Sequence, residues 1–205
     1  MPPLSSALRA EIIAIFARAG IQPGQSVRSS AAIATSRRAA PDSDGNLRWV
    51  LTTEQPATVW DWERWDFVNE VLRMDGLQVP SIGQVPLLDS HARGSVDDQL
   101  GSVTDFVLST AGDYAAVDGL TRWAADEKSQ RTRQKVVDGH ITDGSVGYAV
   151  TRAIWVPDNM EAAIGGKIYQ GPLKVSTEWS LKEFSITPIG ADTLAKVRGR
   201  LAHCR

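Results

Sequence analysis

The chain has 205 residues, of which 42% are hydrophobic and 22% are charged, and its formal net charge is −2. This composition allows one medium-sized domain with a buried core and argues against wholesale disorder. Acidic and basic residues are mixed along the chain, so no basic block predicts binding to nucleic acid. No stretch approaches the ~20 apolar residues of a membrane-spanning helix, and the N-terminus does not resemble a signal peptide.

The single cysteine, Cys204, excludes an intrachain disulfide and a cysteine-based zinc site. We therefore expect neither a metal nor a cofactor. A water-soluble protein of a reducing, cytosol-type compartment is the class that this composition favours.

The clearest helical pattern lies at residues 5–19, where apolar residues recur at helical spacing from Leu8 to Ala19 and Gly20 follows. The helix is either a docking arm or packed on the domain, and the packed arrangement is favoured. Pro23 and Gly24 then break the pattern and predict a linker.

These signals divide the chain into three parts. Residues 1–24 are predicted to form an N-terminal helical arm and linker, residues 25–200 the main domain, and residues 201–205 a C-terminal tail.

From about residue 26 the chain consists mainly of short segments with the alternation that strands show. The predicted strands are SVRSSAAIATS (26–36), LRWVLTTE (47–54), QVPLLDSH (84–91), LGSVTDFVLS (100–109), YAAVDGLTRWA (114–124), HITDGSVGYAVTRAIWV (140–156, one bent strand or two) and LKVSTEWSLKEFSITPI (173–189).

A second helix is predicted within residues 125–138, because acids come early, bases come late and Gly139 follows. Residues 65–74 fit either a strand or a helix. The tryptophans before them are typical of a core or an interface. Many short strands with two or three helices predict an α+β fold or a barrel-like sheet.

The stretch DGHITDGSVGYAV contains a serine with little steric cover. Ser145 lies between Gly144 and Gly147, so a substrate carbonyl can approach closely and backbone N–H groups near it can serve as oxyanion donors. A serine needs a base, which at neutral pH is usually an imidazole. His91 suits this role better than His140, which lies five residues from Ser145 and on the opposite face of an extended strand.

The last predicted strand carries an acid. Glu183 and Ser185 share one face of it, with Phe184 on the other. Such an acid either faces solvent or orients an imidazole, as in a Ser-His-acid triad. From spacing alone, a plain turn at Ser145 and a strand-end histidine at position 91 are the simpler interpretation.

Taken in order, VPLLDSH, DGHITDGSVGY and LKEFSITPIGAD resemble the caudovirus prohead (capsid maturation) serine protease family. In that family a histidine follows an apolar strand, a serine follows in a glycine-containing context, and a strand with an acid comes last. The resemblance covers roughly residues 26–198. The sequence PIGAD departs from the family's usual PIPANPDA at the end of the last motif.

The resemblance implies a mixed, mainly antiparallel β-barrel-like sheet surrounded by helices, as in the related herpesvirus assemblins. It makes His91, Ser145 and Glu183 the catalytic residues and leaves Gly144 and Gly147 as oxyanion candidates. The alternatives for the third catalytic member are Glu178, Asp89, His140 and, at the chain end, His203.

The implied function is a prophage or virus serine endopeptidase (a hydrolase) that acts in capsid assembly and virion maturation. Its expected substrates are the scaffold protein and the major capsid protein, inside the prohead in the host cytoplasm. Neither nucleic acid nor a membrane is expected as a partner, and a homo-oligomer is compatible with the resemblance. The rival expectations are a catalytically silent capsid-assembly or scaffold-like protein with the same fold and an unrelated small β-rich binding module.

Overall fold

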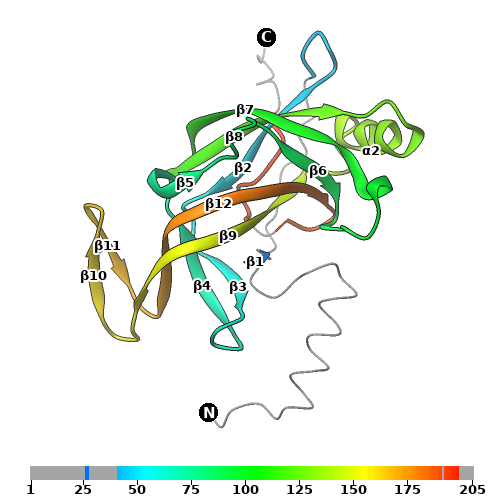
Figure 1. Ribbon diagram of the computed structural model, residues 1–205. Helices are drawn as coiled ribbons and strands as arrows, with labels where there is room; N and C mark the ends of the chain where they lie inside the picture. The colour runs from blue at the N-terminus through cyan, green and yellow to red at the C-terminus, as the bar shows by residue number, and fades with distance from the viewer. Residues whose placement is uncertain (1–25, 28–40, 191, 199–205) are drawn as a thin grey trace, which may run out of the picture.

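The computed structural model describes residues 26–27, 41–190 and 192–198, and strands dominate it (Figure 1). The elements in chain order are β1 (Ser26–Val27), β2 (Leu47–Thr53), β3 (Ala57–Asp61), β4 (Asp66–Leu72), η1 (Met74–Gly76), β5 (Leu77–Gln78), β6 (Val85–Asp89), η2 (Val96–Asp98), β7 (Gln99–Ala111), β8 (Tyr114–Trp123), α2 (Glu127–Val137), β9 (Asp143–Val156), β10 (Glu161–Ile164), β11 (Lys167–Gln170) and β12 (Leu173–Thr187).

Strand β12 is the centre of the ten-stranded main sheet. It pairs antiparallel with β9 along almost its whole length, and its other side runs parallel to β4, β5 and β6 in turn. The sheet continues from β6 through β7 and β8 to β2, while β1 pairs with the outer side of β9. Strands β10 and β11 form a separate hairpin that projects beyond the main sheet (Figure 1).

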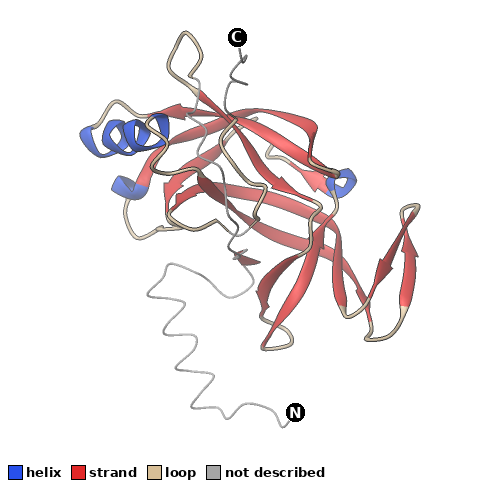
Figure 2. Cartoon of the chain, turned by 180° about the vertical axis from the view of Figure 1, so that it is seen from behind, coloured by secondary structure: helices blue, strands red, loops and turns tan. Residues whose placement is uncertain are grey.

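The predicted α+β fold, with a barrel-like sheet surrounded by helices, is wrong. The described residues contain one α-helix, α2, which contacts β7 and β8, and two short 3-10 helices (Figure 2). The mixed sheet is also not closed into a barrel. Residues 195–198 lie between β2 and the start of β9, with the isolated bridges Trp49–Val197 and Asp143–Lys196.

The physical reason is that the sheet covers its own apolar face. Trp49 of β2 packs edge-on against Phe184 of β12, with ring centroids 5.4 Å apart at 64°. Both side chains are fully buried. Because distant strands of the same sheet supply most of the core, few apolar residues are left that need a covering helix.

Most predicted strands are confirmed. Residues 47–54, 84–91, 114–124 and 173–189 contain β2, β6, β8 and β12, and residues 140–156 contain the single long strand β9. Residues 100–109 lie within β7, which is longer by one residue at its start and two at its end. Of residues 26–36 only β1 is described, and the helix predicted at 5–19 lies outside the described residues.

The helix predicted within residues 125–138 is confirmed as α2. Asp126 caps it by accepting a hydrogen bond from the backbone N–H of Ser129 at 3.0 Å. Gly139 follows with a φ of 81°, which suits glycine. The ambiguous stretch at 65–74 contains strand β4 and the start of η1.

The β10–β11 hairpin was missed by the sequence interpretation, although the sequence carries a signal for it. Gly165 and Gly166 form its two-residue turn, with φ values of 55° and 78°. A Gly-Gly pair between two apolar-containing runs is typical of a tight hairpin. The buried Arg73 holds this turn by donating to the carbonyl of Ile164 at 2.6 Å.

A β-bulge in β12 decides which of its side chains face the core. Leu181 pairs with Tyr148, whereas Glu183 pairs with Gly147, so Lys182 is an extra residue on β12. The core side chains consequently change from odd positions, ending at Leu181, to even positions, starting at Phe184. This bulge directs Glu183 to the face opposite the core.

Candidate active site

Three neighbouring strands bring the predicted catalytic residues together. Ser145 lies near the start of β9, Glu183 lies in β12, and His91 follows β6 by two residues. The sheet order β9–β12–β6 makes these strands adjacent. Ser145 pairs with Ser185 and Gly147 pairs with Glu183, so the four side-chain positions share one face of the sheet.

The contact predicted between His91 and Glu183 is confirmed. Nδ1 of His91 lies 2.6 Å from Oε1 of Glu183, and both side chains are almost completely buried. The other carboxylate oxygen, Oε2, accepts a hydrogen bond from the hydroxyl of Ser185 at 2.8 Å. A carboxylate in these contacts leaves His91 with a proton on Nδ1 and a lone pair on Nε2, the tautomer that a general base requires.

The backbone of His91 is held in an unfavourable conformation. Ser90 and His91 have φ values of 49° and 62°, which residues with a Cβ rarely adopt. The amide N–H of His91 donates to the hydroxyl of Ser185 at 3.0 Å, and the N–H of Ser90 donates to the carbonyl of Ile186 at 3.0 Å. Strain at two successive residues is typical of functional sites, where the surrounding structure enforces the geometry.

Ser145 is 3% exposed and does not hydrogen-bond to His91 in this structure, because Nε2 of His91 is buried without a hydrogen-bond partner. Ser145 lies on β9 and His91 follows β6, and β12 runs between these two strands. Proton transfer from Ser145 to His91 requires these side chains to approach each other. Catalytic hydrogen bonds are often long in the absence of substrate.

The two glycines near Ser145 have different structural roles. The N–H of Gly144 donates to the carbonyl of Ala195 at 3.3 Å, so this amide is already used and is a poor oxyanion donor. A Cβ at Gly144 would meet the ring of Phe184 at 2.1 Å. A Cβ at Gly147 would lie 2.2 Å from Oε1 of Glu183 and 2.7 Å from Nη2 of Arg93. Gly147 is therefore required for the close approach of Glu183.

Arg93 is a site residue that the sequence interpretation missed. Its Nη2 donates to Oε1 of Glu183 at 3.1 Å, the same oxygen that contacts His91. The available signal was its position two residues after the candidate base. Glu183 thus has three donors, which offset the cost of burying its charge.

The alternative third members do not contact His91. Glu178 pairs with Arg152 at 3.3 Å, and Asp89 pairs with Lys128 at 3.1 Å. His140 is exposed in the loop after α2. His203 lies outside the described residues. Glu183 is therefore the member of this set that the fold places against the imidazole.

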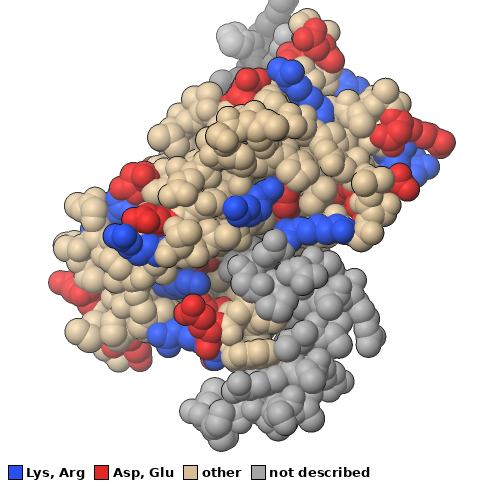
Figure 3. Space-filling model, in the orientation of Figure 1, with Lys and Arg blue, Asp and Glu red and all other residues tan. Residues whose placement is uncertain are grey.

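The surface and the described helices give no strong indication of another class of partner. Figure 3 shows positive and negative side chains interspersed over one face of the molecule. No helix among the described residues is long and apolar enough to cross a membrane.

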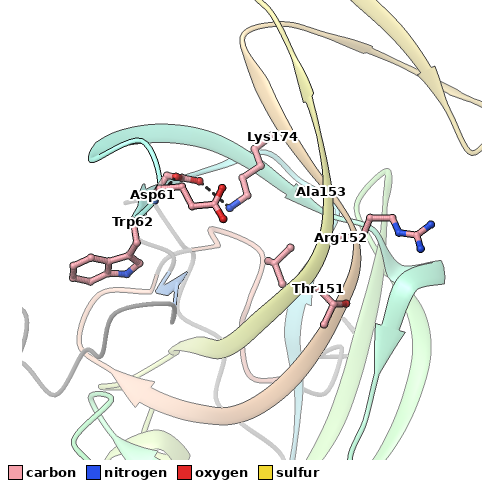
Figure 4. Close-up of a pocket in the computed structure, with 8 residues that line it drawn as sticks. Asp61, Trp62, Thr151, Arg152, Ala153 and Lys174 are labelled. Atoms are coloured by element: carbon pink, nitrogen blue, oxygen red, sulfur yellow. Dashed lines mark hydrogen bonds and ion pairs between the residues drawn. The ribbon is translucent and has the colours of Figure 1, made fainter. Parts of the chain in front are cut away.

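A hollow of about 460 Å³ lies beside residues 150–153 of β9 and the end of β3. Figure 4 shows Lys174 directed toward Asp61 and Arg152 directed away from it. Nζ of Lys174 lies 2.8 Å from Oδ2 of Asp61 and 3.6 Å from Oε1 of the fully buried Glu70. The charges in this hollow compensate one another, and they attach the β3–β4 hairpin to β12.

Comparison of the chain with models of known protein families, with curated proteins and with solved structures finds no match. The resemblance to prohead proteases therefore stays an expectation from the sequence motifs.

We predict that Gly147→Ala disturbs the site without unfolding the protein. The new methyl group would displace the Glu183 carboxylate, and a misplacement of about 1 Å can reduce a rate by roughly 10²-fold. Peptide hydrolysis and chemical unfolding should be measured together. The control is Gly112→Ala, where the nearest atom to the new Cβ, Cδ1 of Leu194, is 4.0 Å away. Because the φ of Gly112 is 58°, this control should lower the free energy of unfolding but leave hydrolysis by the folded protein unchanged. Unchanged hydrolysis in Gly147→Ala would contradict this geometry.

We also predict that Lys174→Met lowers the free energy of unfolding by about 3–5 kcal/mol at pH 7, because it leaves two carboxylates buried without their cation. Burial raises the pKa of Asp61, but hydrogen bonds from Lys174 and from backbone N–H groups outweigh it and lower the pKa below 3.8. The stability that ionised Asp61 contributes is therefore present above about pH 4 and is lost as the pH falls further.

The loss caused by Lys174→Met should accordingly shrink when urea unfolding is repeated at successively lower pH below about 4, as Asp61 becomes protonated. Lys135→Met, at an exposed position of α2, is the matched control. An equal effect of the two substitutions at pH 7 would refute this role of Lys174.

Proposed function

We propose that the chain is a serine endopeptidase with His91 as base, Ser145 as nucleophile and Glu183 as orienting acid. The observation that carries the proposal is the buried 2.6 Å contact between Nδ1 of His91 and Oε1 of Glu183. An imidazole held by a carboxylate has a defined tautomer, and in a Ser-His-acid triad that arrangement activates the serine.

The proposed reaction is acyl transfer. Nε2 of His91 takes the proton from Oγ of Ser145 while Oγ attacks the scissile carbonyl carbon. The resulting imidazolium is stabilised by Glu183 and gives its proton to the leaving amine when the C–N bond breaks. A water molecule, deprotonated by His91 in turn, then attacks the acyl-serine ester and releases the new carboxyl terminus and the Ser145 hydroxyl.

The order of the three motifs favours the prohead protease family, with scaffold and major capsid protein segments as substrates within an immature capsid. This assignment rests on the resemblance of the motifs. The purified chain, mixed with the scaffold and capsid proteins of the same source, is expected to produce discrete fragments on a gel.

The second candidate function is a catalytically silent capsid-assembly protein with the same fold. The observation in its favour is that Nε2 of His91 is buried and is not hydrogen-bonded to Ser145. Active-site labelling separates the two candidates. A fluorophosphonate probe should modify Ser145 in an active protease and leave a silent relative unlabelled.

Ser145→Ala should abolish hydrolysis and leave the fold intact, because it removes one hydroxyl group from the site. Removal of a serine nucleophile typically costs about 10⁶-fold in turnover. Ser185→Ala is an informative control, since Ser185 pairs with Ser145 on the same face and contacts Glu183 and the amide of His91. If Ser145→Ala retains near-native turnover, the nucleophile is another residue.

Glu183→Gln should reduce turnover by about 10⁴-fold, because a neutral amide no longer enforces the useful imidazole tautomer. Asp89→Asn is the matched control, because Asp89 lies near His91 but pairs with Lys128. A Glu183→Gln rate within tenfold of the wild-type rate would exclude the triad.

A further inference from the structure

A hollow of about 530 Å³ adjoins the His91–Glu183 pair on the side of β6 and β7. Apolar side chains of Pro86, Leu88 and Val96 form part of its wall. Arg93, Lys182 and Glu183 bring charge to it. Since Glu183 belongs both to this hollow and to the candidate catalytic site, a substrate residue near the cleaved bond can enter the hollow.

The charge of this hollow is unbalanced. Arg93 uses Nη2 on Glu183, while its Nη1 is buried without a hydrogen-bond partner. Lys182 is exposed and forms no ion pair with any residue that the structure describes. Among the side chains that line the hollow, with His91 neutral, the two cations exceed the one carboxylate by a single positive charge. Asp98, which lies behind the loop wall, has Lys128 as its own cation, with Nζ 3.8 Å from Oδ1.

The loop that forms the outer wall has a fixed shape. One oxygen of Asp98, Oδ2, accepts hydrogen bonds from the backbone N–H groups of Gly94 at 3.1 Å and Ser95 at 3.0 Å. The hydroxyl of Ser95 accepts in return from the N–H of Asp97 at 3.1 Å. The hollow is consequently formed before a ligand arrives, and little ordering free energy is lost on binding.

The β-bulge of β12 explains why Lys182 lines this hollow. In a regular strand Lys182 and Glu183 would point to opposite faces. Because Lys182 is the extra residue between the Leu181–Tyr148 and Glu183–Gly147 pairs, both side chains line the same hollow. The bulge thus places Glu183, the proposed orienting acid, and the cation of Lys182 side by side at this hollow.

We propose that this hollow is a specificity subsite for an acidic side chain, aspartate or glutamate, of the peptide substrate, at a position close to the cleaved bond. The proposal rests on the proposed peptidase function and adds the substrate class to it. The substrate carboxylate accepts from Nζ of Lys182 and, after a small rotation of the partly exposed Arg93 side chain that uncovers Nη1, from Arg93. Its methylene groups contact Pro86 and Leu88.

The unpartnered guanidinium nitrogen supplies the selectivity. A carboxylate satisfies the unused donor of Arg93 with a charge-assisted hydrogen bond, whereas an apolar or basic side chain leaves it unpaired. A basic side chain would also meet two like charges. Sites with unused polar groups discriminate strongly against substrates that cannot satisfy them.

The test uses the full chain and a proteome-derived peptide library, with cleavage sites read by mass spectrometry. Aspartate and glutamate should be enriched at one position near the cleaved bond. Lys182→Gln should reduce kcat/KM for a selected acidic peptide about fivefold, with a smaller effect at high salt. Lys182→Glu should remove the acid preference while cleavage of neutral peptides continues.

Lys135→Glu, an exposed charge reversal on α2, is the matched control and should leave the preference unchanged. Arg93→Lys keeps the positive charge but loses the planar fork, so acid enrichment should weaken without reversing. Cleavage without acid enrichment, or enrichment that Lys182→Glu leaves intact, would overturn the subsite.

A binding experiment separates failure of the subsite from failure of the peptidase proposal. The Ser145→Ala chain is titrated with N-acetyl-Ala-Glu-Ala-amide or its glutamine analogue, and amide shifts are followed by NMR. Shifts at Gly94–Val96 with the glutamate peptide alone, weakened by Lys182→Gln, support the subsite even if the wild-type chain cleaves nothing. Equal responses to the two peptides would count against the subsite, whatever the activity of the wild-type chain.

Discussion

The pairing of β12 with β9 is the constraint on which the rest of the structure depends. This antiparallel ladder runs from Leu173–Val156 to Thr187–Asp143, and the other edge of β12 receives β4, β5 and β6 in succession. A one-residue slip in such a ladder would exchange its core and outer faces. The bulge at Lys182 produces that exchange at a defined point. It leaves Trp179 and Leu181 in the core and places Glu183 on the opposite face.

Two buried carboxylates, Glu183 and Glu70, are each surrounded by hydrogen-bond donors. Glu183 receives His91, Arg93 and Ser185, whereas Glu70 receives the hydroxyls of Tyr148 and Ser176. A buried charge is tolerated when such partners offset its desolvation. The surroundings of Glu183 and Glu70 differ in whether they contain buried polar atoms without a hydrogen-bond partner. Beside Glu183, one nitrogen of His91 and one of Arg93 have no hydrogen-bond partner. Unused polar groups of this kind are more typical of a reaction site than of a structural cluster.

The overall fold disagrees with the family resemblance, whereas the contact between His91 and Glu183 agrees with it. The described residues have neither the barrel-like sheet nor, apart from α2, the surrounding α-helices that the resemblance implied, because the sheet buries its own apolar face. The proximity of His91 and Glu183, which lie 92 positions apart in the chain, is the contact that the last motif implied. Because function depends on the geometry of a site more than on the surrounding architecture, the local agreement keeps the peptidase proposal testable despite the different fold class.

The sequence by itself determined the strands of regular alternation and the helix α2, because period and capping act over a few residues. The choice of His91, Ser145 and Glu183 came from the resemblance of three motifs to a protease family. It also indicated that Glu183 and Phe184 face opposite sides. Tertiary structure alone decided that β12 joins β4, β5 and β6 in parallel, since those partners are distant in the chain. It likewise placed Arg93 on Glu183 and assigned the N–H of Gly144 to Ala195. A hydrogen bond between remote residues depends on sheet order and register, which no local pattern encodes.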